Sequence, residues 1–177
     1  MISGGADLSV SYQIGLNACI MGMMLKAGVN TFWVLLAGLL IGVGLGFLNG
    51  VITVTLKVHP MVTTLATMTV YQGVAYVISG ALTFSGFPAA FKVIGQYYIG
   101  GFLPVSVLVM LAMVILAHVM LTYTYFGRYV YALGGNEDAA LLAGVNTKKM
   151  RVLTFMVSGL FVAVATIVFT SRMGSAS

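Results

Sequence analysis

The side chains that could do chemistry in this chain are polar groups set within long apolar stretches. They are a carboxylate, amides, hydroxyls and phenols, namely Asp7, Asn17, Thr64, Thr67, Thr69, Tyr71, Gln72 and Tyr76. Polar groups are costly in hydrocarbon, so each is a hypothesis for a functional site. Hydroxyl and amide groups near aromatic rings suit a translocation pathway for neutral hydroxylated solutes such as sugars. Two alternatives remain, because threonines can bond to the backbone of their own helix and Asp7 can cap one.

Patterns typical of catalysis and metal binding are missing from the sequence. His59 and His118 are far apart and have no acidic or cysteine companion, and Cys19 is the single cysteine. This excludes a disulfide framework and makes a metal site improbable. The sequence has no G-x-x-x-x-G-K-[ST] motif for binding ATP and no arrangement of nucleophile, base and acid. We therefore expect no metal, no cofactor in this chain and no enzymatic activity of its own.

The composition indicates a membrane protein. Only 6% of the 177 residues are charged, against about 25% in soluble domains, and 60% are apolar. The polar and charged residues are too few to cover the surface of a water-soluble fold. An intrinsically disordered chain is excluded as well, because disorder needs low hydrophobicity and many charges. The net charge of +5 depends on so few residues that it does not indicate nucleic acid as a partner.

Five stretches between the charged residues can each hold a membrane span, for which a helix needs about 20 apolar residues. The expected fold class is an all-α, polytopic bundle of integral membrane helices, with spans at about 8–25, 32–56, 61–80, 104–126 and 152–171. Glycines and prolines punctuate the chain between the third and fourth spans. The segment 81–103 is therefore predicted to be an interfacial loop, with Tyr97 and Tyr98 at headgroup level.

The distribution of Lys and Arg predicts the orientation. With alternating spans, one membrane side carries Lys57, Arg128, Lys148, Lys149 and Arg151, and the other carries Lys26, Lys92 and Arg172. Cytoplasmic loops carry an excess of such residues. The loop 127–151 is therefore predicted to be cytoplasmic. Its Lys148, Lys149 and Arg151 also suit contact with anionic membrane lipid.

A stripe of glycines along the second span predicts close helix packing. Gly38, Gly42, Gly46 and Gly50 recur every four residues, which places four bare backbones on one helix face. Packing is the favoured interpretation, and a moving hinge is the alternative. Asn49 lies beside the stripe and is expected to make a buried hydrogen bond.

The loop 127–151 is predicted to contain a short helix near 137–143. Gly134-Gly135 allows a tight turn, Asn136 can cap the following N–H groups, and Glu137 and Asp138 suit the first turn of a helix. Gly144 is expected to end the helix, and Asn146 to cap the next one. A helix this short needs support from its own membrane domain, the lipid surface or a partner. It could also merely reverse the chain.

Four segments match a known family in order along the chain. They are S-G-G-A-D-L-S-V at 3–10, F-L-N-G at 47–50 with K-V-H-P-M-V-T-T-L-A-T-M at 57–68, F-G-R-Y-V-Y-A-L-G-G-N-E-D-A-A at 126–140 with A-G-V-N at 143–146, and T-S-R-M-G-S-A-S at 170–177. These segments resemble the inner-membrane permeases of ribose-type ABC sugar importers. Ala6 departs from the isoleucine common there, and Ser11-Tyr12 replaces the usual Gly-Ser.

The resemblance implies a function and a set of partners. The chain would be the transmembrane subunit of an ATP-driven importer of a small sugar or polyol in the cytoplasmic (inner) membrane. Its partners would be a second permease subunit, P-loop ATPase subunits and a periplasmic or lipid-anchored sugar-binding protein. The loop 127–151 would dock on the ATPase through Arg128, Gly134, Gly135, Asn136, Glu137, Asp138, Ala139, Ala140 and Gly144.

By the same resemblance, residues 1–177 form a single transmembrane permease domain that is truncated at both ends and covers little more than half of a family member. Two alternatives to the ATP-driven importer stay open. An ion-coupled secondary transporter usually needs an acidic group near the bilayer midplane, and only Asp7 could serve. The chain could also be a non-functional fragment of a permease gene.

Overall fold

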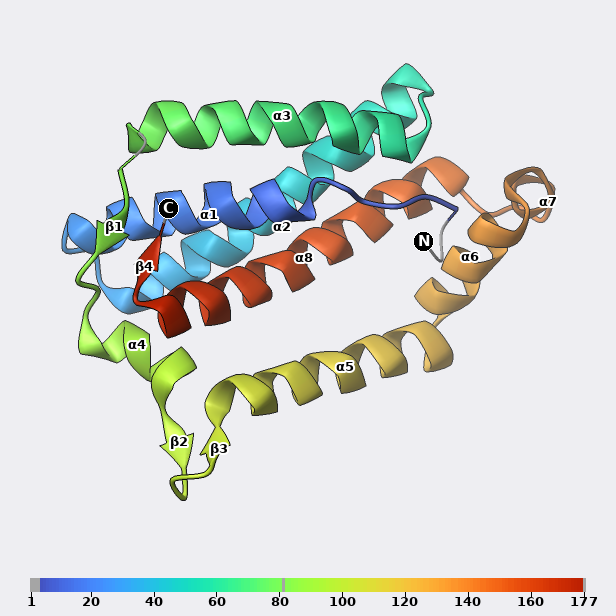
Figure 1. The fold of residues 1–177 in the computed structure, drawn as a ribbon. Helices are drawn as coiled ribbons and strands as arrows, with labels where there is room; N and C mark the ends of the chain where they lie inside the picture. The colour runs from blue at the N-terminus through green and yellow to red at the C-terminus, as the bar shows by residue number, and fades with distance from the viewer. Residues whose placement is uncertain (1–3, 81, 177) are drawn as a thin grey trace.

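The computed structural model describes residues 4–80 and 82–176 and is a bundle of long antiparallel helices (Figure 1). Ser3, which opens the first matching segment, lies outside the described residues. The helices are α1 (Val10–Lys26), α2 (Thr31–Leu56), α3 (Pro60–Ser79), α4 (Ala89–Gln96), α5 (Val105–Tyr123), α6 (Tyr125–Gly135), α7 (Glu137–Leu142) and α8 (Thr147–Met173). Strand β1 (Phe84–Ser85) pairs with β4 (Ser175–Ala176), and β2 (Tyr98–Ile99) pairs with β3 (Leu103–Pro104), both antiparallel.

The all-α membrane bundle is confirmed. Within the described residues, α2, α3, α5 and α8 are long and apolar enough to cross a membrane. The first predicted span is also a helix, but α1 has only 17 residues. Such a helix is about 26 Å long, slightly less than the hydrocarbon core of about 30 Å. Helices α6 and α7 lie at one end of the bundle, and α4 with the β1–β4 pair lies at the other (Figure 1).

The glycine stripe of α2 lies in the tightest helix contact of the bundle. A Cβ added at Gly42 would stand 2.5 Å from Ala163 Cβ of α8, and one added at Gly50 would stand 2.8 Å from Val152 Cα. A Cβ at Gly46 would overlap the carbonyl oxygen of Phe155. Gly38 instead faces α1, where Met21 covers it. Small residues thus let α2 pack against α8 at backbone distance, and at Gly38 they leave room for the Met21 side chain of α1.

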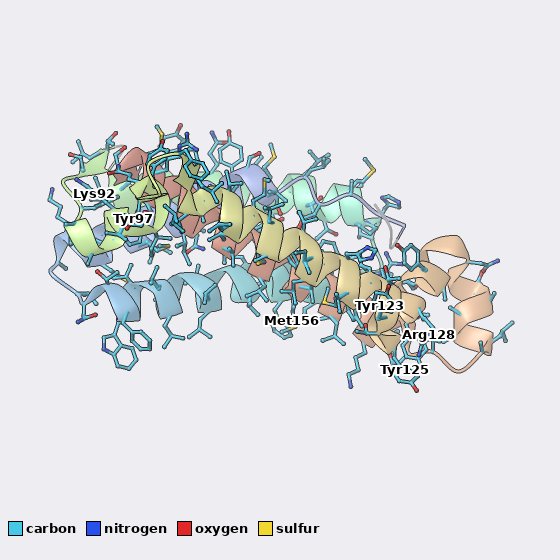
Figure 2. All side chains as sticks on the ribbon, turned by 90° about the horizontal axis from the view of Figure 1, so that it is seen from below. Lys92, Tyr97, Tyr123, Tyr125, Arg128 and Met156 are labelled. Atoms are coloured by element: carbon cyan, nitrogen blue, oxygen red, sulfur yellow. The ribbon has the colours of Figure 1, made fainter. Side chains whose placement is uncertain are left out.

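Helix α5 stands apart from this packing. None of its residues is buried, and its main contacts are with α4, α6 and β3. Figure 2 shows Lys92 and Tyr97 near one end of α5, and Tyr123, Tyr125 and Arg128 near the other. The Arg128 guanidinium lies 4.2 Å from the centre of the Tyr125 ring. Aromatic rings near both ends of an apolar helix are typical of the two membrane interfaces.

The prediction that 81–103 is only a loop is wrong, because the segment contains α4. Phe91 is fully buried, and its ring meets Phe87 edge-on, with centroids 5.7 Å apart. Ser171 of α8 donates to the Phe91 carbonyl and accepts the Gly95 N–H. Phe87 lies just before α4 and Phe91 lies within it, and both pack in a buried cluster with residues of α1, α2 and α8. Tyr97 and Tyr98 remain exposed beside this helix.

The tight turn predicted at Gly134-Gly135 is also wrong. These glycines are the last two residues of α6, a helix that the sequence interpretation did not predict. It treated residues from 127 up to the short helix near 137–143 as loop. Val130 and Leu133 of α6 are buried against Met150 of α8. This apolar contact holds the segment helical until Asn136, which is extended and begins α7.

Candidate functional site

A buried polar network joins the first three helices to α8. Ser9 Oγ donates to Asp7 Oδ1 at 2.6 Å and accepts from Gln13 Nε2 at 2.6 Å and Asn49 Nδ2 at 2.8 Å. Asn49 Oδ1 in turn accepts from the Tyr71 hydroxyl at 2.8 Å. Ser158 of α8 donates to the other carboxylate oxygen of Asp7 at 3.4 Å. Gln13 Oε1 is buried and has no hydrogen-bond partner among the described residues, but the other bonds of the network fix the relative positions of these helices.

Asp7 and Asn17 serve this packing. Asp7 Oδ1 also accepts the backbone N–H of Ser9 at 3.0 Å, at the start of α1. Asn17 is fully buried and donates to the Gly38 carbonyl of α2 at 3.0 Å. The sequence interpretation missed Ser9 and Gln13. Their signal was spacing, because Ser9, Gln13 and Asn17 recur every four residues and so share one face of α1.

The threonines of α3 bond to their own helix. Thr64 Oγ1 lies 3.0 Å from the Pro60 carbonyl, Thr67 donates to the Thr64 carbonyl, and Thr69 donates to the Ala66 carbonyl. Such back-bonding satisfies a hydroxyl inside an apolar medium. Thr64, Thr67 and Tyr71, which donates to Asn49, are buried in the helix packing, whereas Thr69 is exposed.

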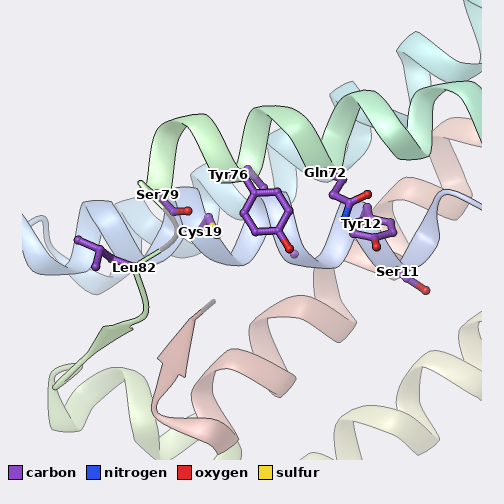
Figure 3. A pocket seen from close by; sticks show the side chains of 9 residues that line it. Ser11, Tyr12, Cys19, Gln72, Tyr76, Ser79 and Leu82 are labelled. Atoms are coloured by element: carbon purple, nitrogen blue, oxygen red, sulfur yellow. The ribbon is translucent and has the colours of Figure 1, made fainter.

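Gln72 and Tyr76 do face an open space, a cavity of about 360 Å³ between α1 and α3. Figure 3 shows both side chains projecting from α3 toward α1. The cavity is also lined by Ser11, Tyr12, Gly15, Cys19, Ala75, Ser79 and Leu82. Sequence reasoning did not identify Ser11, Tyr12 or Ser79, because their contribution depends on which face of α1 meets α3.

The lining of this cavity suits a small hydroxylated molecule. It offers the amide of Gln72, the phenols of Tyr12 and Tyr76, and the serine hydroxyl of Ser11. Amides and hydroxyls both donate and accept hydrogen bonds, and aromatic faces cover the apolar face of a sugar ring. Pockets that hold small ligands typically measure about 300–1,000 Å³. Among the described residues, no three His, Cys, Asp or Glu side chains come together to hold a metal.

One pair of substitutions on α3 distinguishes a residue of the buried network from a residue that lines the cavity. Tyr71→Phe removes the donor to Asn49 Oδ1 and leaves that buried oxygen unsatisfied, which costs about 1–3 kcal/mol. Tyr76→Phe removes the same hydroxyl from a ring that is 58% exposed. In thermal unfolding of the purified chain in detergent, Tyr71→Phe should lower the midpoint and Tyr76→Phe should not. Equal midpoints would show that the network does not hold these helices together.

Helix α7, which precedes the N-terminal end of α8, is built as the sequence predicts. Asn136 Oδ1 accepts the Ala139 N–H at 2.9 Å, and Gly144 ends the turn with φ +83°. Asn146 Oδ1 accepts the Lys149 N–H at 3.0 Å and so begins α8. Each cap satisfies an N–H that the first turn of a helix leaves without a partner.

Two contacts fasten α7 to the rest of the chain. Glu137 forms an ion pair with Arg151 of α8, and Ala140 is buried, at 5% exposure. The burial of Ala140 corrects the expectation that it faces a docking partner. Two leucines of α7 are exposed, Leu141 at 59% and Leu142 at 90%. Asn136, Asp138, Ala139 and Gly144 are also exposed, as are Gly134 and Gly135 of α6.

Comparisons with known proteins identify the family of the chain. The family described as "Branched-chain amino acid transport system / permease component" matches residues 1–177. The chain belongs to this permease family. It is 38% identical to the ribose import permease protein RbsC of Haemophilus influenzae over 99% of its own length and 55% of that relative. It is 35% identical to the autoinducer 2 import system permease protein LsrC of Yersinia enterocolitica, over 98% of its length and 48% of that relative.

Family membership and the apolar helices make the chain a multi-pass protein of the inner membrane. The permease spans about half the length of the curated relatives it matches. These relatives carry names of permeases rather than of enzymes. No solved structure matches the chain significantly.

Proposed function

We propose that this permease chain belongs to the transmembrane part of an ATP-driven importer of a small sugar or related hydroxylated solute. The observation that carries the proposal is α7, a six-residue capped helix that stands at one end of the bundle with an apolar side chain turned outward. An isolated helix of this length is marginal in water. The relatives named for the import of ribose and autoinducer 2 support the same class of activity.

We propose that α7 docks in a groove of a separate ATPase subunit, where ATP is hydrolysed. Leu142 and Ala139 would form the contact, and Asn136 and Asp138 would lie at its rim. This end of the bundle carries more Lys and Arg than the other and is proposed to be cytoplasmic. A sugar-binding protein would then deliver the solute at the opposite end, and a second permease subunit would complete the pathway.

The contacts of α7 provide a route by which movement of the ATPase could reach the solute. The Glu137–Arg151 ion pair joins α7 to α8, and the glycine contact joins α8 to α2. Asn49 of α2 bonds to Ser9 beside α1 and to Tyr71 of α3, the two helices that line the cavity. A displacement of α7 would therefore re-tilt α1 and α3 as packed units and change which membrane side the cavity opens to.

The docking surface can be tested by cysteine crosslinking to a co-expressed ATPase subunit that carries cysteines along its groove. Cys19 is buried and would first be replaced by serine. We expect crosslinks from Ala139→Cys and Leu142→Cys, and none from Ala140→Cys, whose side chain is turned inward. Crosslinking at Ala140 alone, or at none of the three in an assembly that hydrolyses ATP, would contradict the proposed docking.

A further inference from the structure

The chain contains an apolar groove at the opposite end of the membrane from α7. It lies between α1, α5 and α8 and has a volume of about 1,060 Å³. Its walls are apolar side chains of α5 and α8, with Ser11 and Gly15 of α1 on one side. The groove is open because α5 contacts α4 and α6 at its two ends but has no buried residue along its length.

The groove has the length of one lipid leaflet. Along α5 its lining runs from Ser106 to Ala117, and along α8 from Arg172 back to Phe161. At about 1.5 Å per residue, each of these stretches rises about 16 Å. Half of a hydrocarbon core of about 30 Å is about 15 Å. The groove therefore reaches from one membrane interface to the bilayer midplane, as an acyl chain does.

The interfacial end of the groove is positively charged. Arg172 lines it there, and Lys26 and Lys92 lie at the same end of the bundle. Of the three acidic residues, Glu137 and Asp138 lie in α7 at the other end of the bundle. Asp7 bonds to Ser158, which precedes Arg172 by 14 residues of α8, or about 21 Å at 1.5 Å per residue. Among the residues that the structure describes, no acidic side chain therefore lies near Arg172 to neutralise it. Ser106 adds a hydroxyl whose oxygen is buried and has no hydrogen-bond partner among the described residues.

From this match of length, apolarity and charge, we infer that the groove binds an anionic phospholipid. Its acyl chains would lie between α5 and α8, and its phosphate would meet Arg172 and Ser106. Arg is well suited to this task because its planar fork can donate two hydrogen bonds to a phosphate. Such a lipid would fill the space that separates α5 from α8 and would stabilise α5 in its place.

The charge requirement can be tested by native mass spectrometry of the full chain after incubation with phosphatidylglycerol or phosphatidylcholine in detergent. We expect retained phosphatidylglycerol and about fivefold weaker retention in Arg172→Gln, because a basic residue near a headgroup contributes about that factor. Lys26→Gln removes the same charge at the same membrane end without touching the groove and should retain the lipid. Equal retention of both lipids, or an unchanged Arg172→Gln variant, would overturn the inference.

The position of the lipid can be tested by fluorescence quenching in vesicles of equal parts phosphatidylglycerol and phosphatidylcholine, with bromine on the chains of one lipid at a time. The single tryptophan would be moved into the groove by Trp33→Phe with Met113→Trp. We expect brominated phosphatidylglycerol to quench this site more strongly than brominated phosphatidylcholine. Leu116→Trp, outside the groove and 48% exposed, should be quenched equally by both. No quenching at Met113→Trp would show that a protein segment or a second copy fills the groove, and would overturn the inference.

Discussion

Gly46→Ala is expected to lower the free energy of unfolding by about 2 kcal/mol, the range typical of overpacking a tight core. The added Cβ would overlap the Phe155 carbonyl oxygen and stand 3.2 Å from Met156 Cα, and backbone atoms cannot turn away as a side chain can. Helices α2 and α8 would have to separate along their whole contact. Gly46→Leu should separate them further and prevent accumulation of folded protein in the membrane.

Gly44 is the matched control, since it lies on the same helix and a Cβ there would meet nothing within 4 Å. Gly44→Ala should leave stability unchanged or raise it by up to about 1 kcal/mol, because alanine favours helix over glycine. Both variants would be compared by thermal unfolding in the same detergent. A Gly44→Ala variant that loses as much stability as Gly46→Ala would show that the effect depends on glycine in general rather than on this contact.

Leu142→Glu is expected to abolish recovery of the ATPase subunit with the permease while leaving the chain folded. The side chain is 90% exposed, so the substitution disturbs no internal packing. A carboxylate in an apolar docking groove would lose its hydration without gaining a partner, which costs several kcal/mol. In a transporting assembly, solute uptake should fall by at least about tenfold, which corresponds to about 1.4 kcal/mol of lost coupling. The measurements are copurification from detergent-solubilised membranes and uptake of labelled solute.

Phe102→Glu provides the control for this prediction. Phe102 is 81% exposed and lies in the turn between β2 and β3, at the opposite end of the bundle from α7. Phe102→Glu introduces the same negative charge and is expected to leave copurification of the ATPase subunit unchanged. If Leu142→Glu retains the ATPase as fully as Phe102→Glu does, then α7 is not the docking element.

Features that depend on neighbouring residues were predictable from the sequence. The caps at Asn136 and Asn146 and the end of α7 at Gly144 are where the sequence places them, because each satisfies backbone groups within one turn. The long apolar spans were equally predictable, since the bilayer fixes their length. The small residues of α2 indicated a close helix contact, although α8 and α1 as the two partners could not be read from α2 alone.

The candidate site was only partly predictable. Whether a polar residue is buried in packing or lines the cavity depends on which helices meet, and the sequence does not show this. Thr64, Thr67 and Tyr71 are of the same chemical kind as Gln72 and Tyr76, yet the first three are taken up by the packing of α3. Gln72 and Tyr76 line the cavity because they lie on the face of α3 that stands opposite Ser11 and Tyr12 of α1.

The sequence by itself therefore determined the membrane bundle, the capped helix α7 and the family. Tertiary structure decided that 89–96 is a helix, that Ala140 is buried while Leu142 is exposed, and that the polar groups separate into a network and a cavity. The physical reason is the range of the interactions. Caps and helix formation act within about four residues, whereas burial depends on faces brought together from distant parts of the chain.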